Sequence, residues 1–152
     1  MLLCSAIISI LASEAVLASP TIKTFSNPEA CGMSVRAALT KGNGDQVLAY
    51  VDTNADPKTM KIDFGDGPET LILKSSAAAA AGSGGKNGDA LVQVYDGNKA
   101  SVQLTIRSLG PCGNNPLYAD SESCEYTSFA GSMAIKTAQG QKKYDVLADD
   151  GC

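Results

Sequence analysis

Apolar and polar residues alternate with a period of two in short runs from residue 21 onward. In the clearest run, residues 100–107, Val102, Leu104 and Ile106 share one face and polar residues share the other. Because successive side chains of a strand point to opposite faces, this alternation indicates a β-strand with one buried face. The Asp-Gly-Asn-Lys sequence before this run is typical of a hairpin turn.

The same pattern predicts an all-β protein. Most of the apolar runs are separated by Gly, Asn, Asp or Pro, and no long amphipathic helix competes with them. The candidate strands are residues 21–25, 33–40, 46–52, 59–64, 69–74, 90–95, 100–107, 124–136 and 143–147. Many short strands at this spacing predict a β-sandwich over residues 21–112. A C-terminal β-hairpin or ribbon, residues 113–152, is expected to pack on the same domain.

An apolar segment, residues 1–20, precedes the strands. Read with period two, it predicts an extended arm of about 60 Å, which exceeds one strand of a small domain and would contact a neighbouring copy. Glu14 is the one charged residue on the apolar face of this arm. The predicted subunit contacts are Leu2, Cys4, Ala6, Ile8, Ile10, Ala12 and Val16.

Two other interpretations of this segment stay open. Val16-Leu-Ala18 before Ser19 resembles a signal-peptidase site, although no Lys or Arg precedes the apolar run. A helix is the second alternative, since serines recur every four residues. Such a helix resembles the N-terminal helix of type IV pilins, but those carry Glu at their fifth mature position, where this chain has Ser5.

A short motif at residues 63–67 has the sequence Asp-Phe-Gly-Asp-Gly. Gly65 and Gly67 permit positive φ, so the motif predicts a turn, in which Asp66 is expected to accept backbone N–H bonds. The motif resembles the DFGDG signature of PKD (polycystic-kidney-disease repeat) domains, and the similarity extends loosely over residues 45–108.

This resemblance implies an immunoglobulin-like sandwich that acts as a spacer or contact module. Two departures from the family pattern occur. Ile62 or its neighbours stand where a Trp usually precedes the motif, and residues 88–95 replace the usual His-x-Tyr-x-x-Gly-x-Tyr run.

Residues 75–88 are rich in Ser, Ala and Gly. We expect a surface loop here, because small residues contribute little to a core and Gly-rich chains are flexible. The alternative is a strip that another chain's backbone approaches closely.

The chain has five cysteines and none is in a CxxC pair, which favours an oxidising, extracytoplasmic compartment. First and last strands of immunoglobulin-like sandwiches lie side by side, so Cys31–Cys112 is the preferred bridge. A hairpin turn near residue 139 would place Cys152 opposite residue 127, close to Cys124. Cys4 is then left over, either as a link between chains or as a buried thiol.

Composition argues against several functions. The chain has 152 residues, a net charge of -4 and scattered Lys and Arg, which is unlike a nucleic-acid-binding protein. It has no His, the commonest general base, and no pair of acids or activated thiol is apparent, so we do not expect an enzyme.

Asp52, Asn54 and Asp56 resemble the start of a calcium-binding loop, with Asp63 at the twelfth position. Pro57 occupies the position that requires Gly, and the bidentate Glu is missing. The sequence therefore predicts no resident cofactor, with calcium at these residues as the alternative.

Two functions follow from these observations. The first is a structural subunit of an extracellular, pilus-like filament. In it, each sandwich lacks a strand, and the N-terminal segment of the neighbouring copy fills the hydrophobic groove that this leaves. The alternative is a secreted monomeric PKD- or immunoglobulin-like module with a cleaved signal peptide that binds carbohydrate or protein. The expected partners are copies of the chain itself, with O-linked glycan or surface carbohydrate as further candidates, and no nucleic acid or, in the mature form, membrane.

Overall fold

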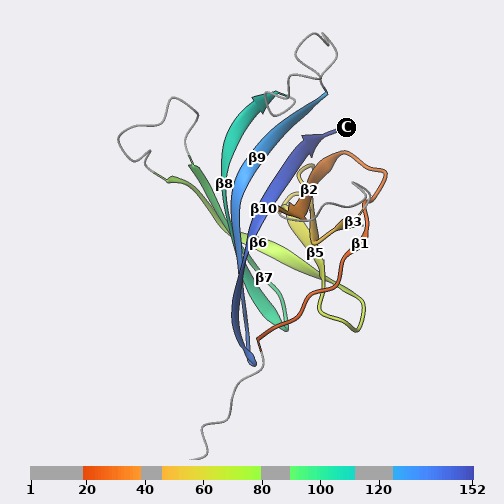
Figure 1. Cartoon of the computed structure of the whole chain (residues 1–152), viewed down its shortest axis with the longest axis vertical. Helices are drawn as coiled ribbons and strands as arrows, with labels where there is room; N and C mark the ends of the chain where they lie inside the picture. Colours follow the sequence, from red (N-terminus) through yellow and green to blue (C-terminus); the bar gives the residue numbers. More distant parts are fainter. Residues whose placement is uncertain (1–18, 39–45, 80–89, 112–124) are drawn as a thin grey trace, which may run out of the picture.

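The computed structural model describes residues 19–38, 46–79, 90–111 and 125–152 (Figure 1). These residues form strands and no helix, which confirms the all-β class, and none of them forms a helix able to cross a membrane. The strands are β1 (Phe25–Ser26), β2 (Gly32–Ala37), β3 (Gln46–Val47), β4 (Ala49–Asp52), β5 (Thr59–Asp63), β6 (Pro68–Ala79), β7 (Ala90–Asp96), β8 (Ala100–Pro111), β9 (Tyr126–Thr137) and β10 (Gly140–Gly151).

Eight strands close into one antiparallel barrel in the order β10-β2-β4-β5-β6-β7-β8-β9. Each strand pairs with the next along the barrel, which is the up-and-down arrangement. The two layers of the expected immunoglobulin-like sandwich are therefore replaced by a single closed sheet. The reason is the C-terminal hairpin: β9 pairs with β8, and β10 pairs with β2 from Val146↔Ala37 to Gly151↔Gly32, which completes the wall.

The core fills the inside of this barrel, as the period-two pattern predicts. In β8, Ala100, Val102, Leu104 and Ile106 are all buried. The largest fully buried side chains of the core are Met60, Ile62, Leu71, Tyr95, Leu104, Ile106, Met133 and Ile135.

Residues 19–31 run along the outside of the barrel (Figure 1). Lys23 forms an isolated bridge with Asp63, and β1 pairs with β3 in a separate two-stranded sheet. This segment leads into β2 through Cys31, so it covers part of the outer wall rather than adding to the barrel.

A disulfide joins Cys31 to Cys152, with the two Cα atoms 4.2 Å apart. Both predicted bridges, Cys31–Cys112 and Cys124–Cys152, are therefore wrong. The expected pairings assumed a sandwich, whereas in the barrel β2 and β10 are neighbours and bring the start of one next to the end of the other. Cys4, Cys112 and Cys124 lie outside the described residues.

The C-terminal hairpin forms as predicted, but its register differs. Gly140 pairs with Thr137 and Gly151 pairs with Tyr126, so the strand position opposite Cys152 is shifted by two residues from the expected residue 127. β10, at 12 residues, is longer than the predicted strand 143–147, whereas β9, also 12 residues, is close to the predicted stretch 124–136.

β6 is the largest departure from the sequence prediction. It continues past residue 74, with a register shift between Leu73 and Ser75, and pairs with β7 as far as Ala79↔Ala90. Residues 75–79, expected to begin a surface loop, are thus strand. The rest of the expected loop, residues 80–88, lies outside the described residues.

Candidate functional site

β6 changes its strand neighbour halfway along. It pairs with β5 from Pro68 to Ile72 and with β7 from Ile72 to Ala79. Past Ile72, apart from a bond from Leu73 N to Lys58 O (2.9 Å), no described residue pairs with the side of β6 that faces away from β7. Alternate residues of a strand direct their backbone N–H and C=O groups to the same side. Residues 74–79, here called the β6 edge, therefore present on that side a row of backbone donors and acceptors that pair with no strand of the described ranges.

The β6 edge carries little protection against pairing. Strand edges that must stay single are usually guarded by charged residues, by proline or by bulges. Lys74, at the bulge, is the one charged residue of the β6 edge, and the Ser-Ser-Ala-Ala-Ala sequence follows it. Residues 74–78 are all exposed. By contrast, residues 140–145 of β10, which precede its pairing with β2, include two lysines and an aspartate.

The N-terminal segment leaves the described structure at the opposite end of β6. Pro20 and Thr21 line a hollow of about 350 Å³ together with Phe64 and Asp66 of the β5–β6 turn. Over its 12 residues, β6 extends roughly 36 Å away from this turn. Figure 1 shows the start of the described chain (red) at the lower end of the barrel and the far part of β6 projecting beside β7 at the upper left.

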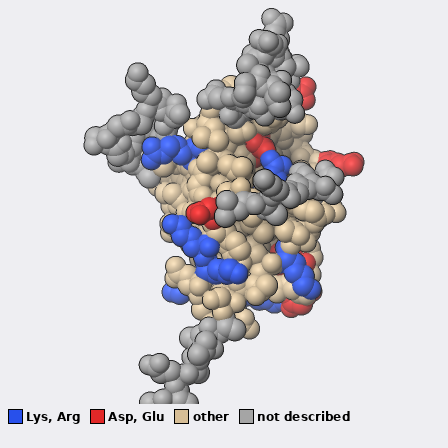
Figure 2. All heavy atoms as spheres, viewed as in Figure 1, with Lys and Arg blue, Asp and Glu red and all other residues tan. Residues whose placement is uncertain are grey.

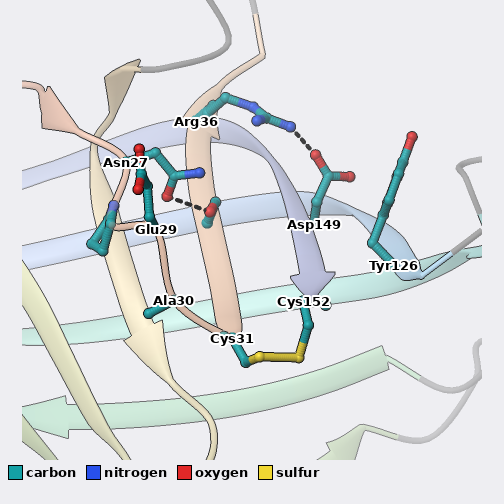
Figure 3. Close-up of a pocket in the computed structure, with 12 residues that line it drawn as sticks. Asn27, Glu29, Ala30, Cys31, Arg36, Tyr126, Asp149 and Cys152 are labelled. Carbon is teal, nitrogen blue, oxygen red and sulfur yellow. Dashed lines mark hydrogen bonds and ion pairs between the residues drawn. A yellow bond between two sulfur atoms is a disulfide. The ribbon is translucent and has the colours of Figure 1, made fainter.

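A second candidate site is a pocket of about 630 Å³ on the outer wall (Figure 3). The outer faces of β2, β10 and β9 form its floor. The chain segment from Asn27 to Cys31, here called the strap, lines its other side. The Cys31–Cys152 disulfide joins the strap to the end of β10, and Tyr50 Oη donates to Cys31 O at 2.9 Å.

Polar groups of this pocket are connected to one another. Arg36 forms an ion pair with Asp149, and Ser128 Oγ donates to the other oxygen of the same carboxylate at 2.5 Å. Ser34 Oγ donates to Asn27 Oδ1 at 2.7 Å and so holds the strap against β2. These five polar side chains are thus held by one another before any ligand arrives.

Residues 63–67 form the predicted turn, but with a different acceptor. Gly65 and Gly67 have φ of 109° and 111°. Asp63 Oδ1, rather than Asp66, accepts the backbone N–H bonds, from Gly65 at 2.6 Å and from Gly67 at 3.2 Å. Asp66 instead accepts a bond from Lys99 Nζ at 2.5 Å, and this bond lowers the pKa of Asp66.

The predicted calcium residues form a polar turn between β4 and β5. Asp52 Oδ1 accepts bonds from the backbone N–H of Asn54 and Ala55. Asn54 Nδ2 donates to Cys31 O at 3.4 Å, so it points towards the strap, and Asp56 is exposed. Within the described ranges, no group of three or more His, Cys, Asp or Glu side chains is arranged to hold a metal ion.

Two buried tyrosines have perturbed acidities. Burial raises the pKa of Tyr95, and the negative charge of Asp150 raises it further. Tyr95 Oη donates to the buried Gln93 Oε1 at 3.1 Å. Burial, followed by the charges of Asp52 and Asp150, also raises the pKa of Tyr50. Both phenols therefore remain neutral over the physiological range and serve as hydrogen-bond donors.

The sequence reasoning missed both candidate sites. For residues 75–79 the sequence predicts a surface loop, with a strip approached by another chain's backbone as the alternative, and it predicts a solvated tail at Asp149. The period-two pattern of β10 nevertheless places Asp149 on an outer face next to Ser128. The predicted subunit contacts, Leu2, Cys4, Ala6, Ile8, Ile10, Ala12 and Val16, lie outside the described residues.

Comparison with known proteins gives no relative for this chain: no family model, curated protein or solved structure matches it. The resemblance to PKD domains is therefore a statement about five residues and their turn. Function must be argued from the geometry of the barrel, its β6 edge and its pocket.

Proposed function

We propose that the protein is a structural subunit of an extracellular filament, in which the N-terminal segment of one copy adds a strand to the β6 edge of the next. The observation that carries this proposal is the absence, among the described residues, of a second strand partner on the side of residues 74–79 that faces away from β7. The acceptor differs from the sequence-based hypothesis. A missing strand in a sandwich was expected, whereas the barrel is closed and the acceptor is the part of β6 that extends beyond β5.

Backbone chemistry favours strand addition at this position. An added strand satisfies the free N–H and C=O groups of an edge, and its alternate side chains determine specificity. Residues 2–18 have the required pattern, with an apolar residue at every even position except Glu14. The short side chains of residues 75–78 leave the β6 edge accessible.

The positions of donor and acceptor favour a polymer. The donor segment leaves near the β5–β6 turn and the acceptor lies roughly 36 Å away at the other end of β6. Contacts between two different surfaces of the same molecule do not close on themselves unless a rotation forms a ring, so they extend into fibres. The Cys31–Cys152 disulfide supports an oxidising location such as the cell exterior.

The surface agrees with contacts made through the backbone rather than through charge. Figure 2 shows Lys and Arg in small groups among Asp and Glu on the face viewed, with uncharged surface between them. A strong field of one sign would oppose the association of identical copies.

The test is assembly of the full-length chain with a charge added to the β6 edge. We expect Ala77→Lys to lower the polymerised fraction at least tenfold, because a strand that pairs there would bury an unpaired ammonium group. Sedimentation and electron microscopy measure the polymer. The matched control is Gln103→Lys, an exposed position on β8 whose two neighbouring strands are already in place.

Deletion of residues 2–18 should abolish assembly and leave a soluble barrel. Polymers that form equally well with Ala77→Lys or with the deletion would contradict the proposal. A monomer whose residues 75–79 are protected from amide hydrogen exchange only when residues 2–18 are present would contradict it too, since the segment would then pair within its own molecule.

A further inference from the structure

The outer-wall pocket has a bare floor because two facing positions admit only glycine. Gly32 on β2 pairs with Gly151 on β10, which pairs with Tyr126 on β9. A Cβ atom at Gly32 would lie 2.4 Å from Tyr50 Oη, and one at Gly151 would lie 2.4 Å from the backbone oxygen of Glu125. Backbone, Tyr50 and Tyr126 therefore occupy the space that side chains at these two positions would need, and they form the floor of the pocket there.

The next row of the same three strands supplies the polar end of the pocket. Ser34, Asp149 and Ser128 face one another across β2, β10 and β9. Ser34 and Ser128 are buried, with exposed fractions of 7% and 9%. Both are hydrogen-bonded, so the polar end is rigid rather than adaptable.

The strap closes the opposite side and is fixed at two points. Its Asn27 side chain bonds to Ser34, and its last residue, Cys31, is covalently linked to Cys152. Figure 3 shows Asn27 and Glu29 on one side of the hollow and Asp149 and Tyr126 on the other. A ligand in the hollow would thus lie between an aromatic side chain and a set of planar polar groups.

We propose that this pocket binds a neutral saccharide unit. Asn, Asp, Glu and Arg side chains supply both donors and acceptors in planar pairs, which suits neighbouring hydroxyl groups that donate and accept at once. A tyrosine ring offers an apolar face to the C–H groups of a sugar and a polar edge to its hydroxyls. The volume of about 630 Å³ lies within the ordinary range of small-molecule sites.

The charges of the pocket disfavour anionic ligands. Arg36 and Asp149 neutralise each other, and Glu29 adds a carboxylate at the exposed side. An anion in the pocket would be repelled by the Glu29 carboxylate, and the Arg36 charge that could offset this repulsion is already neutralised by Asp149. Phosphates and acidic sugars are therefore disfavoured. The inference does not depend on polymer formation, because the pocket lies on β2, β9 and β10 and the β6 edge lies elsewhere on the barrel.

The experiment titrates the full-length, oxidised protein with methyl glycosides of glucose, galactose, mannose and N-acetylglucosamine, and with glucuronic acid as the anionic comparison. Protein-observed NMR locates and quantifies binding. We expect at least one neutral glycoside to give saturable shifts at residues of the strap and at Tyr126, and glucuronic acid to bind at least tenfold more weakly.

Variants assign the binding to the pocket. Tyr126→Ala should lower the affinity for the neutral glycoside at least tenfold, whereas Tyr126→Phe should retain most of that affinity. Asp149→Asn should also lower the affinity, and its amide spectrum should remain that of a folded protein. Gln103→Lys serves as the control away from the pocket. Absence of saturable shifts with every neutral glycoside, tighter binding of glucuronic acid, or unchanged affinity in both Tyr126→Ala and Asp149→Asn would overturn the inference. None of these results bears on the Ala77→Lys assembly test.

Discussion

Tyr95 combines a buried aromatic ring with a hydroxyl group that needs a hydrogen-bond partner. Its ring is fully buried in the core, and its hydroxyl donates to Gln93, which is itself buried. A phenol can be buried at low cost only if its hydrogen finds an acceptor. The pair thus allows an aromatic side chain of this size to fill the barrel beside Val102 on the neighbouring strand.

Stability should fall above about pH 10, the ordinary pKa of tyrosine. Burial raises the pKa of Tyr95 in the folded state, so above that pH the unfolded chain loses its proton while the folded chain keeps it. The stabilisation is therefore complete below pH 10 and is lost as pH rises towards the folded-state pKa. Denaturant unfolding between pH 8 and 11 measures this decline, which Tyr95→Phe should make shallower. An equally steep decline in Tyr95→Phe would assign it to other groups, of which Tyr50 is the first candidate.

Among the elements, the β5–β6 hairpin depends most on one side chain. Asp63 Oδ1 accepts two backbone N–H bonds within the turn, whereas Asp66 contacts Lys99 at the exposed surface. The sequence predicted the turn and its positive-φ glycines correctly, since glycine tolerates that conformation. It could not assign the acceptor, because two aspartates lie within bonding distance along the chain and only the three-dimensional turn chooses between them.

Asp63→Ala should lower the free energy of unfolding by about 2 kcal/mol, since bonds to a charged acceptor contribute about 1.5–3 kcal/mol. Thermal and denaturant unfolding measure the loss. Asp66→Ala is the matched control and should cost less, because its side chain is fully exposed and solvent screens its ion pair. A larger loss in Asp66→Ala than in Asp63→Ala would show that the turn is held differently.

At the same scale, most strands could be located from the sequence and their partners could not. Residues 100–107 and 59–64 alternate clearly, and both are strands that begin at the expected residue; β5 ends at Asp63, whereas β8 continues four residues further than predicted, to Pro111. Residues 75–79 have no apolar alternation, because their side chains are small and exposed. These residues form a strand because their backbone pairs with β7. Backbone pairing of this kind cannot be inferred from the pattern of side chains.

For the whole molecule, the barrel depends on the pairing of β2 with β10. This pairing was not expected, since a C-terminal ribbon packed on a sandwich and a ribbon inserted into a barrel have the same alternation of residues. The pocket depends on it as well: it spans the β2–β10 contact and joins residues 27–36 to residues 126–152, which lie at least 90 positions apart. Sequence spacing therefore gave no signal for the pocket.

The disulfide should stabilise this closure. Cys31 and Cys152 are 121 residues apart, and a loop of this length predicts a contribution of about 2–5 kcal/mol. We expect the double variant Cys31→Ser, Cys152→Ser to lose that amount in denaturant unfolding. The double variant Cys112→Ser, Cys124→Ser is the control and should lose less. The opposite ranking, together with an intact Cys31 thiol by mass spectrometry, would contradict the assigned connectivity.

The β2–β10 contact also governs how the chain reaches its native state. The barrel wall is complete only when residues 32–37 pair with residues 146–151. Topologies dominated by such distant pairings fold slowly, in milliseconds to seconds. A nascent chain emerging residue by residue would keep the inward faces of seven strands uncovered until β10 has been synthesised. We therefore expect a window before β10 emerges in which a chaperone must shield the chain from aggregation.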